Sequence, residues 1–154
     1  MQHITTSYKD YIITTDKSLM NLADIHKWLS EEAYWSKEIP YDTVRTLFEN
    51  SYCIGAMKGT EQIAFARLVT DYATFGYLAD VYVVEAHRGE GISKQMLDLL
   101  FGMDWVKYLR RTMLSTIYAH DLYRKYGFTE CRYPDRLMEI LRSPDMYKQM
   151  TEET

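Results

Sequence analysis

The apolar positions in the first part of the chain follow a strand-like pattern and then a helical one. Residues 11–15 are largely apolar and β-branched, which predicts a strand. Apolar side chains then recur every three or four residues, and Asp16 or Ser18 can cap the helix that this spacing predicts. The residues that would share its buried face are Leu19, Leu22, His26 and Leu29. We expect this helix to end near Trp35.

A second helical pattern begins after Pro40, with Asp42 as its expected N-cap. Its buried face would hold Val44, Leu47 and Phe48. The pattern then changes to β-branched and aromatic segments separated by short turns, which predicts an antiparallel meander. The three strands of this meander are expected at 52–57, 62–70 and 75–84.

The remaining chain alternates between helix and strand. A helix that starts at Ile92 would bury Met96, Leu97, Leu100 and Phe101. The elements expected after it are a strand at 112–117, a short helix at about 119–126 closed by Gly127, and a last strand at 136–141. This order predicts an α+β fold, in which a mixed, mostly antiparallel sheet is flanked by about four helices.

Length and composition favour a single globular domain. The chain has 154 residues, of which 47% are hydrophobic and 26% charged. We therefore expect one domain over residues 1–154, with a core at about 10–141 and a polar tail at 142–154. No apolar run is long enough to span a bilayer, and the first residues lack the charged and apolar blocks of a signal peptide, which favours a cytoplasmic location.

The cysteines and the net charge narrow the function further. Cys53 and Cys131 are the only cysteines and lack metal-ligand spacing. Cys53 falls in a predicted strand, so a buried free thiol is expected there. The formal net charge of −4 argues against nucleic acid as the main partner.

The turn Arg88-Gly89-Glu90-Gly91 joins the strand that ends at Val84 to the helix that begins at Ile92. The first N–H groups of a helix have no partner within it, and the helix dipole adds positive charge there. Glycine allows close approach to the backbone, and arginine matches phosphate oxygens. The turn is therefore a candidate anion site.

Two common phosphate motifs do not fit this turn. A Walker A loop requires Gly-Lys-Ser/Thr at its end, but Gly91 is followed by Ile92-Ser93. The dinucleotide fingerprint requires a third glycine at the position that Lys94 occupies. The turn does resemble the pyrophosphate loop of the GNAT acetyltransferases, Arg/Gln-x-x-Gly-x-Gly/Ala, with Ser93 as the one small residue that departs from the pattern.

A second motif supports this resemblance. The segment 122–128, Leu-Tyr-Arg-Lys-Tyr-Gly-Phe, is similar to the GNAT element Leu-Tyr-x-x-x-Gly-Phe, and Ala119 matches the usual alanine before it. Thr116 stands where many relatives have asparagine. The order of elements is also that of the GNAT acyl-CoA N-acyltransferase fold. The segments 64–75 and 77–83 resemble a bacterial subgroup of the family, which does not supply a substrate.

The resemblance implies an N-acetyltransferase that moves an acetyl group from acetyl-CoA to a primary amine by direct transfer, without a metal. The residues that it places around the pyrophosphate are Arg88, Gly89, Glu90, Gly91, Ile92 and Ser93. Val83 and Val84 would end a strand that diverges from its neighbour and pairs with the pantetheine arm. Tyr123 matches the family tyrosine that protonates the leaving thiolate as general acid. Core packing is the alternative role for Tyr123, since it shares an apolar helix face.

The resemblance identifies the base less clearly than the acid. The positions that carry a base in some relatives hold Tyr77 and Ala79 here. Strand alternation places Asp80 on the other face, as a structural carboxylate. The groups that remain open as bases are Glu85, His120, Asp71 and water chains. The aromatic residues that could line an acceptor pocket, or simply pack in the core, are Tyr34, Trp35, Tyr72, Phe75 and Tyr77.

Two other functions stay open from the sequence. The same fold can serve as a non-catalytic acyl-CoA-binding or regulatory module, and a different fold could bind ATP or NAD without binding coenzyme A. For the enzyme, we expect a small-molecule or peptide amine as acceptor, neither nucleic acid nor membrane as a partner, and a homodimer as one arrangement open to the chain.

Overall fold

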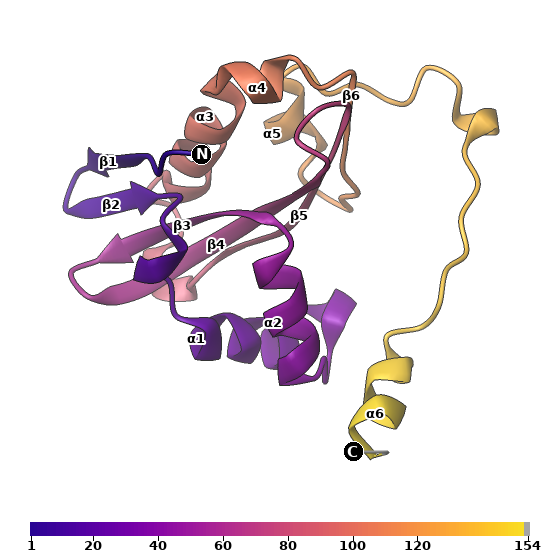
Figure 1. Cartoon of the computed structure of the whole chain (residues 1–154), viewed down its shortest axis with the longest axis horizontal. Helices are drawn as coiled ribbons and strands as arrows, with labels where there is room; N and C mark the ends of the chain where they lie inside the picture. The colour runs from indigo at the N-terminus through magenta and orange to yellow at the C-terminus, as the bar shows by residue number, and fades with distance from the viewer. Residues whose placement is uncertain (153–154) are drawn as a thin grey trace.

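A six-stranded sheet forms the centre of the molecule in the computed structural model, which describes residues 1–152 (Figure 1). The strands follow each other in chain order across the sheet. Their bounds are β1 Thr5–Tyr8, β2 Tyr11–Thr14, β3 Tyr52–Lys58, β4 Glu61–Thr70, β5 Phe75–Val83 and β6 Arg111–Met113. Neighbouring strands are antiparallel except β5 and β6, which are parallel.

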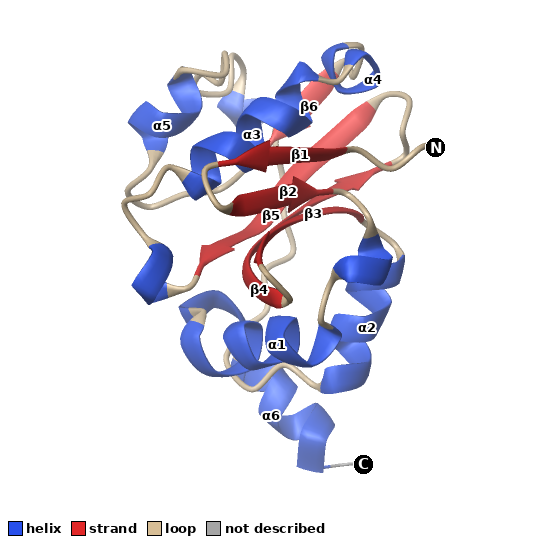
Figure 2. Cartoon of the chain, turned by 90° about the vertical axis from the view of Figure 1, so that its left-hand side faces the viewer, coloured by secondary structure: helices blue, strands red, loops and turns tan. Residues whose placement is uncertain are grey.

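Helices cover both faces of this sheet (Figure 2). The α-helices are α1 Leu22–Lys27, α2 Tyr41–Glu49, α3 Ile92–Gly102, α4 Asp104–Lys107, α5 His120–Arg124 and α6 Asp145–Glu152. Successive strand residues point to opposite faces. Ile54 and Ala64 therefore pack with Met96 of α3, whereas Cys53 and Phe65 pack with α1 and α2.

Shorter helical turns complete the connections. A π-helical segment at Trp28–Glu32 follows α1, and 3-10 turns occupy Lys17–Leu19, Tyr34–Ser36, Glu85–His87 and Pro134–Arg136. Among residues 1–152, no helix is long and apolar enough to cross a membrane.

The α+β class, the meander and the helix after the glycine turn are confirmed, but the described residues form six α-helices where about four were expected. The first predicted helix is instead divided into the 3-10 turn at Lys17–Leu19, α1 and the π-helical segment, and Leu19 is exposed. Asp16 caps only the short turn, since its Oδ1 accepts from the Ser18 N–H at 2.9 Å. Asn21 caps α1. Pro40, and not Asp42, occupies the N-cap position of α2.

Three strand predictions need correction. β1 was not expected, because its sequence Thr-Thr-Ser-Tyr is polar and short. The strand predicted at 112–117 ends at Met113, where the chain leaves the sheet. The strand predicted at 136–141 has no partner in the described chain, and those residues lie in an exposed segment that leads to α6. The expected polar tail contains this helix, Asp145–Glu152.

The end of the pairing between β5 and β6 creates the space for a site. Only Phe75, Gly76 and Tyr77 of β5 pair with β6, opposite Arg111, Thr112 and Met113. β5 then continues to Val83 beside β4 alone, while residues 114–118 diverge from it. Backbone groups on this side of β5 are therefore free to bind a ligand.

Candidate active site

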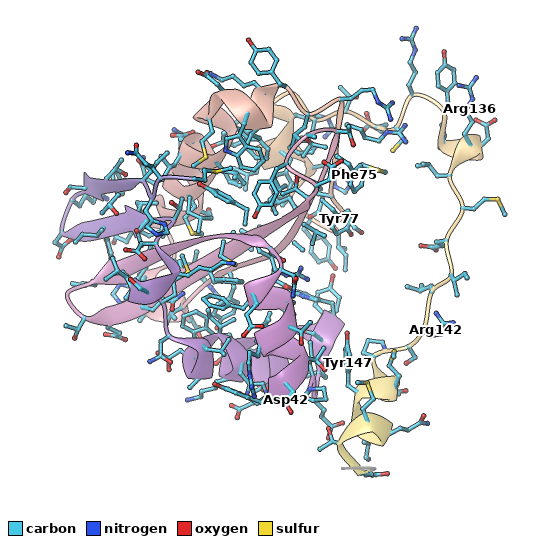
Figure 3. All side chains as sticks on the ribbon, viewed as in Figure 1. Asp42, Phe75, Tyr77, Arg136, Arg142 and Tyr147 are labelled. Carbon is cyan, nitrogen blue, oxygen red and sulfur yellow. The ribbon has the colours of Figure 1, made fainter. Side chains whose placement is uncertain are left out.

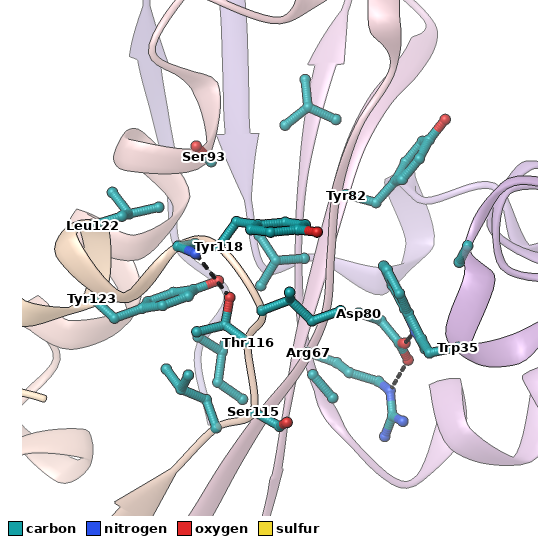
Figure 4. A pocket seen from close by; sticks show the side chains of 18 of the residues that line it. Trp35, Arg67, Asp80, Tyr82, Ser93, Ser115, Thr116, Tyr118, Leu122 and Tyr123 are labelled. Atoms are coloured by element: carbon teal, nitrogen blue, oxygen red, sulfur yellow. Dashed lines mark hydrogen bonds and ion pairs between the residues drawn. The ribbon is translucent and has the colours of Figure 1, made fainter. Parts of the chain in front are cut away.

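A cavity of about 810 Å³ occupies the divergence between β5 and residues 114–118. The glycine loop and the start of α3 form one end, and the 32–35 segment forms the other (Figure 4). Residues 77–83 of β5, residues 114–118 and the start of α5 line the length between them. One continuous space thus joins the predicted anion site to an aromatic wall.

The glycine loop has the backbone shape that its sequence predicts. Gly89 and Gly91 have φ angles of 80° and 83°, which favour glycine. Gly91 is the N-cap of α3 and provides no capping side chain, so the first N–H groups of the helix are left for a ligand. A Cβ at Gly91 would lie 2.8 Å from the Tyr8 Oη. This loop requires glycine for its conformation and for the space around it.

The unexpected strand β1 supports the loop from outside. The Tyr8 hydroxyl donates a hydrogen bond to the Glu90 carbonyl at 2.9 Å. The Lys9 ammonium pairs with the Glu90 carboxylate at 3.1 Å. Glu90 does not line the cavity, in agreement with a carboxylate turned away from the ligand. Sequence reasoning missed this support because the contacts join residues more than 80 positions apart.

Arg88 lies on the cavity wall and is held from two directions. Its Nε donates to the Val83 carbonyl at 2.9 Å, and its guanidinium lies 5.6 Å from the centre of the Tyr82 ring. The terminal Nη groups make none of the hydrogen bonds recorded for the described residues. They are the part of this side chain that can contact a phosphate.

The two valines at the end of β5 differ in their positions. Val83 lines the cavity, as do Gly89, Gly91, Ile92 and Ser93 of the loop. Val84 lies outside the lining, and its N–H donates to the Ile63 carbonyl at 2.9 Å. A role of the Val84 N–H in ligand binding would require loss of this bond.

Tyr123 projects from α5 toward the cavity, beside Thr116 (Figure 4). Its side chain is 8% exposed and packs on Phe128, with ring centroids 6.0 Å apart. Burial raises the pKa of the Tyr123 hydroxyl, so this group stays protonated through neutral pH. Thr116 is itself held by the Ala119 N–H, which donates to its Oγ1 at 3.1 Å. The hydroxyl therefore combines a core position with access to the cavity.

Three of the predicted aromatic residues line the far end of the cavity. Tyr34 and Trp35 contact each other edge to face, with centroids 5.1 Å apart, and Tyr77 lines the same cavity from β5. Tyr72 and Phe75 do not line this cavity. Tyr72 packs instead with Trp105, at 5.3 Å between centroids.

An ion pair on β5 organises this wall. Asp80 accepts from Arg67 Nε at 2.6 Å and from Trp35 Nε1 at 2.7 Å (Figure 4). Phe65 and Arg67 of β4 are two positions apart, but their partners on β5, Tyr82 and Ala79, are three positions apart. This extra residue forms a β-bulge, in which Asp80 adopts φ 54°. The expected alternation fails here because the bulge inserts one residue, so the Asp80 carboxylate is hydrogen-bonded as predicted but is on the cavity wall.

A second carboxylate on the wall was not predicted. Glu32 ends the π-helical segment and accepts a hydrogen bond from the Tyr82 hydroxyl. It belongs to none of the ion pairs of the described residues. The three side chains left open as bases, Asp71, Glu85 and His120, lie outside the cavity lining.

Asp71 illustrates why an acidic residue near the motifs need not serve the site. Its Oδ1 accepts from the backbone N–H groups of Ala73, Thr74 and Phe75 at 2.7–3.0 Å. Together with the Thr74 hydroxyl, these bonds lower the pKa of the Asp71 carboxyl well below its usual value. Asp71 therefore closes the β4–β5 turn. Within residues 1–152, no group of three or more His, Cys, Asp or Glu side chains is arranged to hold a metal ion.

A sheet that opens between two parallel strands, beside a glycine loop at a helix N-terminus, defines the class of GNAT-fold proteins. The model of the acetyltransferase (GNAT) family matches residues 22–128, and the chain belongs to this family.

Individual relatives agree with this assignment. A protein of Xanthomonas campestris pv. campestris, provisionally described as a GNAT-family acetyltransferase, is 40% identical, with a TM-score of 0.87 over 92% of this chain and 99% of its own. A Gibberella zeae protein provisionally named as an acetyltransferase is 32% identical over an alignment 136 residues long, and the match covers 75% of this chain and 77% of the relative. This curated relative is fungal, so assignment to a bacterial subgroup stays a prediction.

A more distant structure shares the fold. A Clostridium acetobutylicum protein described as a predicted acetyltransferase was solved with acetyl-CoA. It is 21% identical to this chain, with a TM-score of 0.61 over 91% of this chain and 95% of its own.

Proposed function

We propose that this protein transfers the acetyl group of acetyl-CoA to a primary amine, which is a small molecule or a peptide, in a ternary complex. The observation that carries this proposal is the single cavity that joins the glycine loop, the buried Tyr123 hydroxyl and the aromatic and acidic wall. Both substrates can lie in it at once, as direct transfer requires.

The loop end of the cavity fits a pyrophosphate. Gly91 leaves the backbone uncovered, the first N–H groups of α3 have no side-chain cap, and Arg88 supplies donors from the side. The Clostridium acetobutylicum structure has the same fold and was solved with acetyl-CoA, which supports acetyl-CoA as a ligand of this fold. Val83 and the diverging β5 edge are then placed to pair with the amide groups of pantetheine.

The opposite end fits an amine. Glu32 supplies a carboxylate that no described cation neutralises, whereas the Asp80 charge is balanced by Arg67. Tyr34, Trp35 and the other rings can contact a cation through their faces. The Glu32 carboxylate therefore attracts the amine in its protonated form, and the amine loses its proton afterwards.

The chemistry follows from these positions. The amine nitrogen attacks the thioester carbon, the new C–N bond forms, and the C–S bond breaks. The proton that the nitrogen loses passes to water in the cavity, and water returns a proton to the Tyr123 oxygen after the thiol has formed. Backbone N–H groups on the open edge of β5 polarise the carbonyl oxygen. Tyr123 gives its proton to the leaving sulfur. Its raised pKa suits this role, because the hydroxyl is still protonated when the reaction begins.

A cytoplasmic location stays a prediction.

A thiol-release assay with acetyl-CoA and a panel of amines tests the proposal. We expect free coenzyme A to form only when an amine is present, together with an acetylated amine of the expected mass. Glu32→Gln removes the wall charge and should raise the KM for cationic amines more than for neutral ones. Binding of coenzyme A without turnover of any amine would favour the non-catalytic module.

A further inference from the structure

The segment from 129 to 143, which we refer to as the arm, begins beside β6 and then lies away from the rest of the molecule (Figure 1). Every residue in it is exposed. It nevertheless carries four large apolar side chains: Leu137 (39% exposed), Met138 (98%), Ile140 (82%) and Leu141 (80%). A monomer would leave this apolar run in water, which is unusual for a contiguous set of large side chains.

The backbone of the arm is also without partners. Leu137 has an extended conformation, with φ −92° and ψ 137°. Among the described residues, none forms a hydrogen bond with the backbone of 138–142. A strand is predicted at 136–141, and unpaired strands bind other strand edges through their main chain. The arm therefore has the properties of a strand that lacks its neighbour.

The sheet presents a matching open edge. β6 is the last strand and pairs only with β5, so the other side of Arg111–Met113 is free. A groove of about 500 Å³ lies beside it, with Thr112, Leu109, Phe101 and Phe128 among its lining residues. The groove has room for additional chain, its lining combines apolar side chains with basic ones, and the first arm residues, 129–132, form part of it.

Both ends of the arm are attached to the body of the same chain. Phe128 packs on Phe101 and Tyr123 just before the arm begins. After it, Tyr147 of α6 packs against the core cluster formed by α1, α2 and the sheet. Figure 3 shows Tyr147 on the side of α6 that faces the body, whereas Arg136 and Arg142 lie apart from the sheet. These two attachments hold the apolar run outside its own groove.

We propose that the arm is exchanged between two copies of this chain, so that residues 136–141 of each copy pair with the β6 edge of the other. Each chain has one unpaired strand and one open edge. In a two-fold pair of copies, the same contact occurs twice and pairs both unpaired strands with both open edges. A different protein would need its own open edge for the arm and its own strand for the β6 edge. The occupant of the groove is therefore a second copy.

This exchange has a consequence for the active site, which rests on the proposed function. Residues 114–118 continue directly from β6, form one wall of the cavity and have exposed side chains at Ile117 and Tyr118. A strand paired along β6 would extend the ordered edge toward this wall. Each arm would thus support the cavity of the partner subunit.

Light scattering after size exclusion tests the association without any substrate. We expect the full chain to elute as a dimer and Ile140→Asp to elute as a monomer with an unchanged circular dichroism spectrum. The matched control is Leu19→Asp, which places the same charge on an exposed apolar residue far from the arm and should stay dimeric. Hydrogen exchange at 111–118 should be faster in Ile140→Asp than in the control. A monomeric full chain, or a dimeric Ile140→Asp, would overturn the proposal.

Cross-linking separates exchange from an arm that folds back on its own chain. Ile140→Cys and Thr112→Cys are prepared separately, with different tags, in a Cys131→Ser background and mixed with a short bismaleimide. We expect a cross-linked dimer that contains both tags, and neither variant incubated alone should give a cross-linked dimer. A double variant that cross-links only within one chain, with no mixed product, would show that the arm pairs in cis and would overturn the proposal. This outcome leaves the proposed acetyl transfer untouched, because it involves no substrate.

Discussion

The Tyr123 hydroxyl is the group whose removal tests the chemistry most directly. Tyr123→Phe keeps the ring packing on Phe128 and removes only the proton donor. We expect kcat to fall about 10²-fold or more, the usual scale of general acid catalysis, with little change in melting temperature. Because burial raises the pKa of Tyr123, the wild-type rate should begin to fall only above the ordinary tyrosine pKa of 10.0, where the proton is lost.

Single-turnover data with the most active amine provide the measurement, so that product release does not hide the chemical step. Tyr108→Phe is the control, since Tyr108 is 83% exposed and does not line the cavity. Lower stability with normal turnover in Tyr123→Phe would show instead that the hydroxyl has a structural role.

Gly91 allows the conformational and the steric requirement of the loop to be separated. A left-handed conformation costs a non-glycine residue about 1–2 kcal/mol, and a Cβ here would also lie 2.8 Å from the Tyr8 Oη. Gly91→Ala should therefore lower the free energy of unfolding more in the wild-type background than in a Tyr8→Phe background, where the hydroxyl is absent. Urea unfolding of the wild type, the two single variants and the double variant measures this difference. Gly102→Ala, with no heavy atom near its added Cβ, should be neutral or stabilising. An equal cost in both backgrounds would contradict the steric part.

The two thiols differ in burial, which predicts different reactivity. Cys53 is 1% exposed and burial raises its pKa to about 12, so almost no thiolate is present near pH 8. Cys131 is exposed on the arm. A thiol reagent should label one cysteine per native chain and two after denaturation. Mass spectrometry of the labelled peptides identifies which one reacted, and fast native labelling of Cys53 would contradict its burial.

At the scale of elements, the sequence predicts best those whose signal is local. The meander follows from apolar and aromatic segments separated by short turns, and α3 follows from apolar residues at helical spacing. β1 has no such signal, and its place depends on pairing with β2. The strand predicted at 136–141 has no partner in the described chain, and the local sequence does not determine which edge would complete it. α1 is shorter than its pattern because the π-helical segment interrupts it.

The bulge in β5 depends on the Asp80 carboxylate. Asp80 is 6% exposed and Arg67 17% exposed at the side chain, so Asp80→Ala leaves a largely buried guanidinium without its partner. We expect a loss of about 2–4 kcal/mol in the free energy of unfolding, near the range for broken buried pairs. Asp80→Asn keeps an acceptor for Trp35 and tolerates the positive φ, so it should lose less.

The exposed pair Lys58–Asp10, at 3.5 Å, provides the comparison for Asp80. Asp10→Ala should change stability far less, because water screens that pair. Chemical denaturation of the three variants gives the comparison. If Asp80→Ala and Asp10→Ala were equally mild, the ion pair would not be what holds the bulge.

At the scale of the whole molecule, the site divides into a part that the sequence reveals and a part that it does not. The glycine loop and Tyr123 belong to short motifs, and the structure brings both to one cavity. Glu32, Arg67 and Asp80 come from three separate elements and meet only when the sheet and the π-helical segment pack together. A polar residue without a motif gives no sign of such a meeting, and the bulge reverses the alternation that would locate Asp80.

Coenzyme binding should therefore appear as a property of the complete fold. A ligand that binds only the native state stabilises it by about 2.7 kcal/mol at 100 times its Kd, and a domain of this size gains about 2–4 °C in Tm per kcal/mol. We expect coenzyme A and acetyl-CoA each to raise Tm by about 5–10 °C in a thermal melt, whereas ATP and NAD at the same concentration should have little effect. Gly91→Val is the matched variant, because a branched side chain would collide with the Tyr8 hydroxyl and strain the left-handed backbone, which should distort the loop and remove the shift. A shift with ATP or NAD that equals the shift with coenzyme A would mean that the loop recognises a nucleotide phosphate in general, and that the open edge of β5 does not contribute to binding.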